Sequence, residues 1–268
     1  MEHSTDLALH KKALLIHERL CAEYNCPIAY FGDLDPLSEL VSSLLSHRTK
    51  NADSHRAFQA VTARFATWEQ VRDAPTEEVQ TAIASCTWPE QKAPRLQEIL
   101  RQITNLRGEL SLDFLGEMEV IEARAWLQQL TGVGPKTSAA VLAFSTLRRA
   151  ALPVDSHHHR VAARLGLIPS SLAVGPSHAV LEAQLPPDWD AQKVYDNHEV
   201  LMLHGQRVCF FNNPACARCV VLDLCLFGQK RIAASGGKTV GLPRKADTAR
   251  DDAGTAFAAE SASEMTGD

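Results

Sequence analysis

Lys136 has a residue type and a position that could support nucleophilic chemistry. In the segment LTGVGPKTSAAVLAF, residues 130–144, we expect Gly134 to cap a helix, Pro135 to take its first position and Lys136 to lie in its first turn. A cation there opposes the helix dipole by a few tenths to about 1 kcal/mol, which marks a candidate functional site. Two interpretations stay open: a nucleophile whose amine is partly desolvated at the mouth of a cleft, or a solvated lysine that contacts phosphate.

The turn in front of Lys136 has the composition of an anion-binding loop. Gly132, Val133 and Gly134 separate the helical patterns of residues 119–130 and 135–147, so the sequence predicts two helices joined by a glycine-bracketed turn. Backbone N–H groups of such a turn and of a helix start are free to bind an anion, and phosphate is the natural candidate.

Asp155 is an acidic residue placed nineteen positions after Lys136, within PVDSHHHRVAARLGLIP. It could simply cap the helix that begins at Ser156, which is the usual role of an aspartate there. Because a nearby carboxylate raises the pKa of a lysine, a functional pair makes sense only if Asp155 also stabilises positive charge or accepts a proton. The three histidines at 157–159 cannot all point the same way on one helical turn, and we expect them at the surface or facing phosphate.

Four cysteines crowd into 17 residues with the spacing C-x6-C-x2-C-x5-C, which is a strong signal for a metal site; they are Cys209, Cys216, Cys219 and Cys225. Tetrahedral zinc and an iron–sulfur cubane both use four cysteines, and the spacing alone does not decide between them. Arg207 and Arg218 flank these residues and could contact phosphate. The other three cysteines, Cys21, Cys26 and Cys86, are isolated in sequence, so we expect packing residues and no disulfide framework.

The net charge of −5 does not exclude a nucleic-acid partner, because it is unevenly distributed. Residues 247–268 carry six acids and one base, so the rest of the chain is neutral overall, and residues 228–246 carry five bases and no acid. No early apolar run resembles a signal peptide and no apolar stretch reaches membrane length, so we expect a cytoplasmic location, nucleoid-associated if the chain is bacterial.

Helices must position these residues, because apolar residues recur at helical spacing almost throughout and convincing period-2 strands are missing from the pattern. We expect about ten or eleven helices. Start signals include Asp35 before a proline, Thr67 followed three residues later by a glutamine, and Asp190. From about Gly228 onward the composition lacks periodicity and predicts a disordered tail.

On the hairpin LTGVGPKT, the segment VDSH and the cysteine spacing together, the chain resembles the endonuclease III group of helix-hairpin-helix DNA glycosylases, over most of residues 30–228. The resemblance implies an all-α fold with two helical lobes and a cysteine-ligated iron–sulfur loop, with DNA bound across the cleft between the lobes. The implied parts are an N-terminal helix at 1–33 that joins the iron–sulfur lobe, a six-helix barrel at 34–146 that ends in the hairpin, the iron–sulfur lobe at 147–228 and the tail at 229–268.

The resemblance also implies a reaction and its residues. A damaged nucleotide of double-stranded DNA is flipped out of the stack, Lys136 attacks its anomeric carbon and displaces the base, and Asp155 stabilises the developing charge. A Schiff base at Lys136 then allows elimination of the 3′ phosphate, which is the lyase step, and abasic sites are therefore also substrates. Oxidised pyrimidines are the expected lesions, the four cysteines would hold a 4Fe–4S cluster, and we expect a monomer. Implied DNA contacts are Arg48, Trp88, Gly132, Val133, Gly134, Lys136, His157, Arg207 and Arg218.

Two loops depart from the family pattern. Arg48 and Asn51 stand where family members often carry a glutamine and an aspartate, and Trp88 is bulkier than the aliphatic residue often found at its position. We expect Arg48 and Trp88 to fill the space that the flipped nucleotide leaves. Two alternatives stay open: an adenine mismatch glycosylase relative, which usually lacks the lysine, and a non-catalytic or redox-sensing DNA-binding protein that has kept the hairpin.

Overall fold

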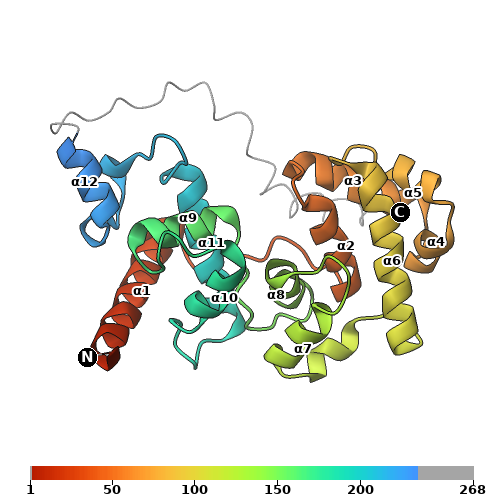
Figure 1. Cartoon of the computed structure of the whole chain (residues 1–268), viewed down its shortest axis with the longest axis horizontal. Helices are drawn as coiled ribbons and strands as arrows, with labels where there is room; N and C mark the ends of the chain where they lie inside the picture. Colours follow the sequence, from red (N-terminus) through yellow and green to blue (C-terminus); the bar gives the residue numbers. More distant parts are fainter. Residues whose placement is uncertain (1, 235–268) are drawn as a thin grey trace, which may run out of the picture. The chain divides into compact units, whose positions relative to one another are not determined.

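The computed structural model describes residues 2–234, and every regular element within them is helical, as the sequence predicts (Figure 1). The described residues form twelve α-helices, more than the ten or eleven expected, because short helices such as α4 and α5 carry little periodic signal. Three short 3-10 helices accompany them, η1 (Asp113–Glu117), η2 (Cys216–Arg218) and η3 (Leu222–Leu224). The α-helices are α1 (Glu2–Tyr24), α2 (Pro36–Ser46), α3 (Asn51–Arg64), α4 (Trp68–Asp73), α5 (Thr76–Ala82), α6 (Pro89–Arg107), α7 (Val120–Leu127), α8 (Pro135–Phe144), α9 (Ser156–Leu165), α10 (Val174–Glu182), α11 (Ala191–Arg207) and α12 (Leu226–Ala234).

Local capping chemistry determines where several helices start, and the three start signals read from the sequence are confirmed. Asp35 accepts hydrogen bonds from two backbone N–H groups of α2, Thr67 accepts one from the N–H of Gln70 in α4, and Asp190 accepts one from the N–H of Lys193 in α11. Each side chain satisfies donors that the helix itself cannot pair.

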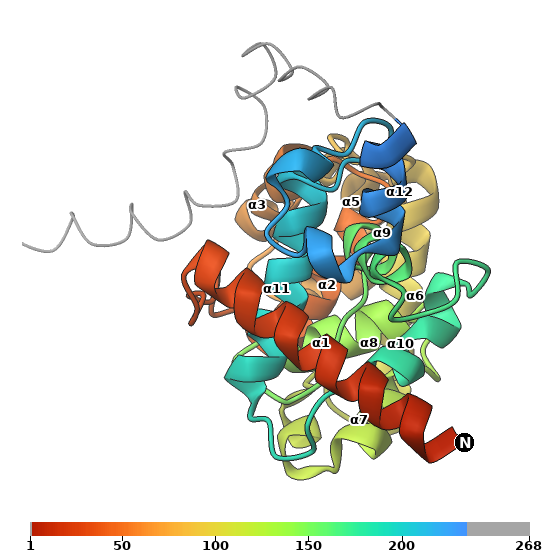
Figure 2. The same ribbon diagram turned by 90° about the vertical axis from the view of Figure 1, so that its left-hand side faces the viewer.

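The chain divides into two compact units. The first unit combines residues up to Ala29 with the described residues from Arg149 onward, and the second runs from Tyr30 to Arg148. In the first unit α11 packs against both α9 and α1, and Figure 2 shows α1 crossing α11. Its core consists of aliphatic side chains of these helices, among them Ile16, Leu20 and Val200.

In the second unit, α2 is the central helix, since it packs against α3, α6 and α8 and is buried along most of its length. Gln97 of α6 is a fully buried polar residue that ties the neighbouring helices together. Its Nε2 donates to the carbonyls of Val71, 2.9 Å away, and Ala74, 2.7 Å away, and its Oε1 accepts from the hydroxyl of Thr76 at 2.7 Å. Each polar atom of the amide is therefore paired, as burial requires.

Two expectations about the chain are corrected by the structure. Cys21 and Cys26 are not separate packing residues but form a disulfide, because the turn after α1 folds back so that the N–H of Cys26 donates to the carbonyl of Cys21 at 3.0 Å. Residues 229–234, assigned from the sequence to the tail, continue α12, while residues 235–268 lie outside the described part of the chain. No helix within residues 2–234 is long and apolar enough to cross a membrane.

Gly205 in α11 is expected to be essential for the packing of the first unit, since a Cβ there would lie 2.8 Å from Cβ of His157 in α9. Gly205→Ala should therefore lower the free energy of unfolding by about 1–3 kcal/mol. Urea unfolding followed by circular dichroism measures this difference. Gly175→Ala in α10 is the matched control, because a Cβ there meets nothing within 4 Å, and it should leave stability unchanged or slightly raised. Equal effects of the two substitutions would contradict this account.

Candidate active site and cysteine pocket

The hairpin that carries Lys136 forms as the sequence predicts. Gly134 is the N-cap of α8, Pro135 is its first residue, and Lys136 lies in the first turn with its side chain partly buried rather than fully solvated. Gly132 has φ of 82°, in the left-handed region that favours glycine, and a Cβ there would also lie 3.3 Å from Cδ of Arg95. The positive φ therefore favours glycine at 132, and Arg95 would have to shift to admit a side chain there.

Neighbouring helices hold this turn in place. Gln102 of α6 makes two hydrogen bonds with Thr131, accepting from its N–H at 3.0 Å and donating to its hydroxyl at 2.8 Å. His47, at the end of α2, bonds the hydroxyl of Thr137 through Nε2 at 3.0 Å. Val133 is buried with 5% exposure, so it anchors the turn in the core. Lys136 is thus flanked on both sides by fixed residues.

The surroundings of Lys136 are positively charged. Burial, together with the positive charges of Lys136, Lys92 and Arg95, lowers the pKa of His47 to about 4. His47 is therefore neutral at pH 7, while the two lysines and the arginine provide the positive potential that a phosphate backbone would require. Glu39 is the buried carboxyl of this region, and burial raises its pKa to about 7, against the opposing effect of Lys136.

Arg48 and Trp88 occupy strained positions on two exposed loops. Each precedes a helix, α3 and α6 respectively, and each has a positive φ, 52° for Arg48 and 56° for Trp88. Such a conformation is uncommon for a residue other than glycine and persists only where the surroundings impose it. Arg48 is exposed, and Trp88 is 47% exposed despite its large apolar ring. Both side chains are accessible to a ligand.

The two loops are fastened to each other by Thr49 and Lys92. The hydroxyl of Thr49 accepts from the N–H of Thr87 at 3.2 Å and from Nζ of Lys92 at 2.8 Å. The same lysine also donates to the carbonyl of Leu45, at the end of α2. No pattern in the sequence singles out this lysine, because its partners lie more than 40 residues away.

Asp155 caps α9, since its carboxylate accepts from the N–H of His158 at 2.7 Å and its side chain is partly exposed. The capping role weighed from the sequence is therefore present. Asp155 belongs to the first unit and Lys136 to the second.

The expectation that all three histidines lie at the surface or face phosphate is wrong for His158. Its ring is fully buried, because the third residue of α9 faces α11, where His198 stacks on it with ring centroids 5.7 Å apart. Its two ring nitrogens have no hydrogen-bond partner among the described residues. His157 and His159 are partly exposed, and they bond Arg160 at 3.1 Å and the carbonyl of Leu172 at 2.8 Å respectively.

Glu199 of α11 is a buried carboxyl that the sequence reasoning did not single out. Its exposure is 6%, and its Oε1 lies 3.9 Å from Nε2 of His198. Burial, together with the nearby carboxylates of Asp155 and Asp196, raises its pKa to about 8. Glu199 is therefore predominantly protonated at neutral pH, because its ionisation would place a second negative charge near the capping carboxylate of Asp155.

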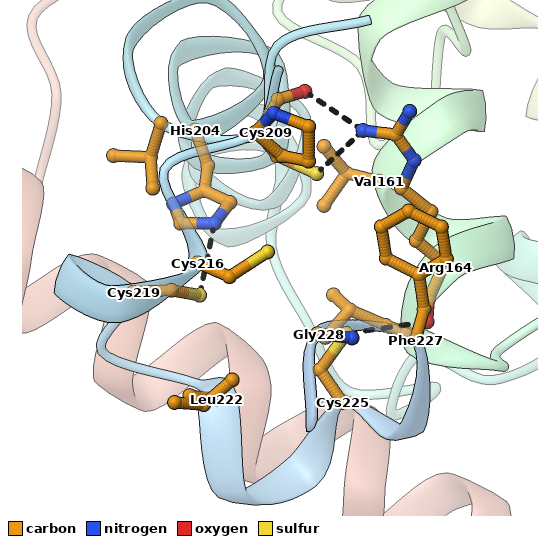
Figure 3. A pocket seen from close by; sticks show the side chains of 13 residues that line it. Val161, Arg164, His204, Cys209, Cys216, Cys219, Leu222, Cys225, Phe227 and Gly228 are labelled. Carbon is orange, nitrogen blue, oxygen red and sulfur yellow. Dashed lines mark hydrogen bonds between the residues drawn. The ribbon is translucent and has the colours of Figure 1, made fainter. Parts of the chain in front are cut away.

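The four clustered cysteines, Cys209, Cys216, Cys219 and Cys225, form no disulfides and line one pocket, with their sulfur atoms directed toward a shared space (Figure 3). Arg164 of α9 extends along one wall, where its guanidinium donates to Sγ of Cys209 at 3.3 Å and to the carbonyl of Phe210 at 2.7 Å. The N–H of Gly228 donates to Sγ of Cys225 at 3.3 Å. The pocket thus directs hydrogen-bond donors at sulfur, as sites with bound thiolates do.

His204 connects this pocket to the end of α1. Its Nε2 lies 3.4 Å from Sγ of Cys219, and its Nδ1 lies 3.2 Å from the hydroxyl of Tyr24. Burial lowers the pKa of His204 to about 4 and raises that of Tyr24 to about 12, so both groups are neutral at pH 7. The consistent arrangement is that Tyr24 donates to Nδ1 and Nε2–H donates to Cys219.

Arg207 and Arg218 are both exposed beside the pocket, and Arg218 donates a hydrogen bond to the carbonyl of Arg207. Two exposed arginines of the first unit therefore flank the cysteine loop and are joined through the backbone of Arg207.

Comparisons with known proteins identify the class of protein that this fold and these residues define. Residues 41–185 match the HhH-GPD superfamily of base excision DNA repair proteins. Endonuclease III of Thermotoga maritima is 30% identical over 200 residues, covering 74% of this chain and 86% of that protein. An Arabidopsis thaliana protein described as a candidate DNA glycosylase is 32% identical over 173 residues, covering 65% of this chain and 57% of that protein.

The fold also matches solved structures. A trapped covalent intermediate of endonuclease III with DNA superposes with a TM-score of 0.70 at 22% identity, covering 83% of this chain and 98% of that one. The chain belongs to the HhH-GPD superfamily, and within it to the endonuclease III family of DNA-binding repair enzymes.

Glu199 should make the stability of the folded chain depend on pH. Its pKa of about 8 lies above the ordinary value of 4.5, so the folded state binds this proton more tightly than the unfolded state. The resulting stabilisation is complete below the ordinary value and is lost as the pH rises through about 8. Glu199→Gln cannot ionise, so its free energy of unfolding relative to wild type should rise progressively from about pH 5 to about pH 8.

Urea unfolding across that pH range measures this difference. The matched control is Glu18→Gln, a substitution of an exposed carboxyl on α1 in the same unit, and its difference from wild type should stay nearly constant. A difference between wild type and Glu199→Gln that does not change with pH would show that Glu199 is already ionised in the folded state.

Proposed function

We propose that Lys136 and Asp155 carry out the DNA glycosylase and abasic-site lyase reactions of this endonuclease III family member. The observation that carries the proposal is the partly buried Lys136 on the first turn of α8, behind a glycine turn fixed by Gln102 and His47. The relatives support the reaction class, since they include endonuclease III enzymes and a DNA glycosylase and abasic-site lyase of Arabidopsis thaliana, ROS1.

In the proposed reaction, neutral Nζ of Lys136 attacks the anomeric carbon of a flipped damaged nucleotide, and the bond to the base breaks with its electron pair leaving on the base. Asp155 stabilises the positive charge that develops on the sugar. Ring opening gives an imine between Lys136 and the sugar, and loss of a proton from the adjacent carbon expels the 3′ phosphate. Oxidised pyrimidines and abasic sites in duplex DNA are the proposed substrates.

Lys136→Gln should abolish the covalent adduct that borohydride forms by reducing the imine, because an amide cannot act as the nucleophile. Trapping of an abasic-site duplex on a denaturing gel measures this. Lys193→Gln, which removes an exposed lysine of α11, is the matched control and should trap as well as wild type. Asp155→Asn should lower single-turnover base release about 10²–10⁴-fold while DNA affinity is largely kept. Undiminished trapping by Lys136→Gln would refute the assignment.

We further propose that the four clustered cysteines hold a 4Fe–4S cluster. In a mononuclear zinc site the Zn–S bonds are about 2.3 Å long, so tetrahedral ligands lie less than about 4 Å apart. Among the described residues, only one group of three or more potential ligand atoms lies within 4.8 Å of one another, and it contains none of these four cysteines. Their sulfur atoms are therefore spaced more widely than a single ion requires, which favours a polynuclear cluster.

Gly228 supports the same assignment. A Cβ at this position would lie 2.9 Å from Cδ1 of Leu222 and would contact Sγ of Cys225 and Sγ of Cys216 at 3.5 and 3.6 Å, so the absence of a side chain leaves the wall beside these sulfurs open. Breaking a glycosidic bond needs no electron transfer, so the cluster would serve to hold the loop that presents Arg207 and Arg218 to DNA phosphates.

A monomer in the cytoplasm, bound to duplex DNA, is the proposed working form.

Arg48 and Trp88 are proposed to enter the duplex when the damaged nucleotide leaves it. Extrusion leaves a gap and an unpaired base, at a cost of a few kcal/mol. The guanidinium of Arg48 can stack and can bond a guanine edge bidentately, and the ring of Trp88 can replace lost stacking. The proposal is supported by their exposure, by their positive φ values and by the bonds that join the two loops through Thr49.

Arg48→Ala should flatten the preference for the base opposite the lesion, because each lost bidentate contact costs about 1–3 kcal/mol of discrimination. The measurement is single-turnover cleavage of one lesion placed opposite each of the four bases. Trp88→Ala should lower all four rates together, and Arg64→Ala, an exposed arginine at the far end of α3, should change none of them. A uniform loss in Arg48→Ala would instead make Arg48 a phosphate contact.

A further inference from the structure

A second group of potential metal ligands lies in the first unit, apart from the cysteine pocket. Sγ of Cys21, Sγ of Cys26 and a carboxylate oxygen of Asp196 all lie within 4.8 Å of one another. Among the described residues, no other set of three such groups is this compact. Cys21 belongs to the last turn of α1, Cys26 follows the turn after it, and Asp196 comes from α11.

Asp196 is held in a defined orientation by donors from two segments. Its exposure is 5%, and Oδ1 accepts from the N–H of Ile28 at 2.8 Å and from Nε2 of Gln192 at 2.9 Å. Both bonds use the same oxygen, so Oδ2 takes part in neither. Carboxylates that bind metal ions are themselves oriented by hydrogen bonds, as this one is.

His17 supplies a fourth donor one helical turn before Cys21. Its Nε2 lies 3.6 Å from Sγ of Cys21, and its ring packs against Trp189 with centroids 4.3 Å apart. The side-chain amide of Asn197 lies 3.5 Å from its Nδ1. The ring is 9% exposed, so its position is fixed by packing on one side and by a polar neighbour on the other.

We propose that His17, Cys21, Cys26 and Asp196, named here the α1-end cluster, bind one Zn²⁺ ion when the Cys21–Cys26 disulfide is reduced. Two thiolates, one imidazole and one carboxylate form a donor set typical of zinc. A carboxylate oxygen of Asp196 lies within 4.8 Å of both sulfurs, and the sulfurs, which are bonded to each other in this structure, would move apart on reduction to share one ion. His17, with Nε2 3.6 Å from Sγ of Cys21, would complete the set from α1. The chain would then carry two sulfur sites of different kinds, a compact one for a single ion and a wider one in the cysteine pocket.

The disulfide and the zinc complex are alternative states of the same two sulfurs. Reduction by a dithiol breaks the S–S bond, transfers two electrons and two protons to the cysteines and leaves the reductant as a disulfide. Zn²⁺ then displaces the two thiol protons as it binds. In the reverse direction, a disulfide oxidant accepts two electrons from the thiolates, the S–S bond re-forms and Zn²⁺ is released.

A zinc ion in the α1-end cluster would hold the end of α1, which contacts the cysteine pocket through Tyr24. Tyr24 lies between Cys21 and Cys26 in sequence, and its hydroxyl bonds His204, which in turn bonds Cys219. In the oxidised state a hydrogen bond from the N–H of Ile28 to Asp196 already joins this segment to α11, and a bound ion would add coordination by the same carboxylate.

The test is the zinc content of the full chain in its two redox states. Wild-type protein is reduced with dithiothreitol under argon, incubated with excess ZnCl₂, desalted and analysed for zinc and iron by mass spectrometry. We expect one additional zinc per chain over the same protein oxidised with diamide, and two fewer maleimide-reactive thiols in the oxidised sample. Reduced protein that gains no zinc would show that Cys21 and Cys26 form only a disulfide and would overturn the proposal.

Variants locate the ion. Cys21→Ser and Cys26→Ser should each lose the additional zinc, while Cys86→Ser, which removes a free buried cysteine of the other unit, should keep it. Iron content should be the same in all of them, which separates this site from the cysteine pocket. Asp196→Asn preserves the shape of the side chain and should weaken zinc binding at least about tenfold. Zinc retained in full by both serine variants would place the ion elsewhere and refute the α1-end cluster.

Discussion

The close approach of α11 to α9 at Gly205 is the constraint on which most of the first unit depends. A side chain at this position would collide with His157, and the glycine carbonyl accepts from the guanidinium of Arg160 at 2.8 Å. Because α11 can lie this near to α9, its buried face meets the turn that begins at Asp155. The same helix ends at Arg207, two residues before the first cysteine of the pocket, so one packing contact positions both the capping aspartate and the start of the cysteine loop.

The close packing of α11 against α9 buries polar groups, and this burial costs electrostatic free energy. Four consecutive polar residues of α11, 196–199, are each no more than 6% exposed, and buried polar groups are tolerated only when they are paired or neutral. Asp196 is paired with donors from Ile28 and Gln192, whereas Glu199 is neutralised by its raised pKa. Such a concentration of buried polar groups beside a capping aspartate is more typical of a functional region than of an ordinary helix interface.

In the second unit, the side chains proposed to contact DNA are positioned by rigid loops rather than by buried charged groups. Arg48 and Trp88 adopt left-handed conformations that cost about 1–3 kcal/mol each, and such strain persists only where neighbouring structure imposes it. Thr49 and Lys92 provide that constraint by joining the two loops. The turn before Lys136 is fixed by the same kind of contact, through Gln102 and Thr131. The exposed side chains are thus presented by a rigid backbone, which lowers the entropy lost on binding DNA.

Features that depend on residues close together in the chain could be predicted from the sequence. The helical class follows from apolar periodicity, and the starts of α2, α4 and α11 follow from Asp35, Thr67 and Asp190, since a cap acts on N–H groups two or three residues away. The glycine hairpin with Lys136 in the first turn of α8 is local in the same sense. The cysteine spacing identified a ligand loop because all four sulfurs lie within one short segment.

Features that join distant segments became visible only once the helices were packed together. Asp196 meets Cys21 and Cys26 across about 170 residues, and no periodicity or spacing records such a contact. The burial of His158 depends on which face of α9 meets α11, and the raised pKa of Glu199 depends on the same packing. Lys92 fastens two loops whose sequences carry no common pattern. Burial, pairing and proton affinity arise from what surrounds a side chain in space, so they become defined only when the helices are packed.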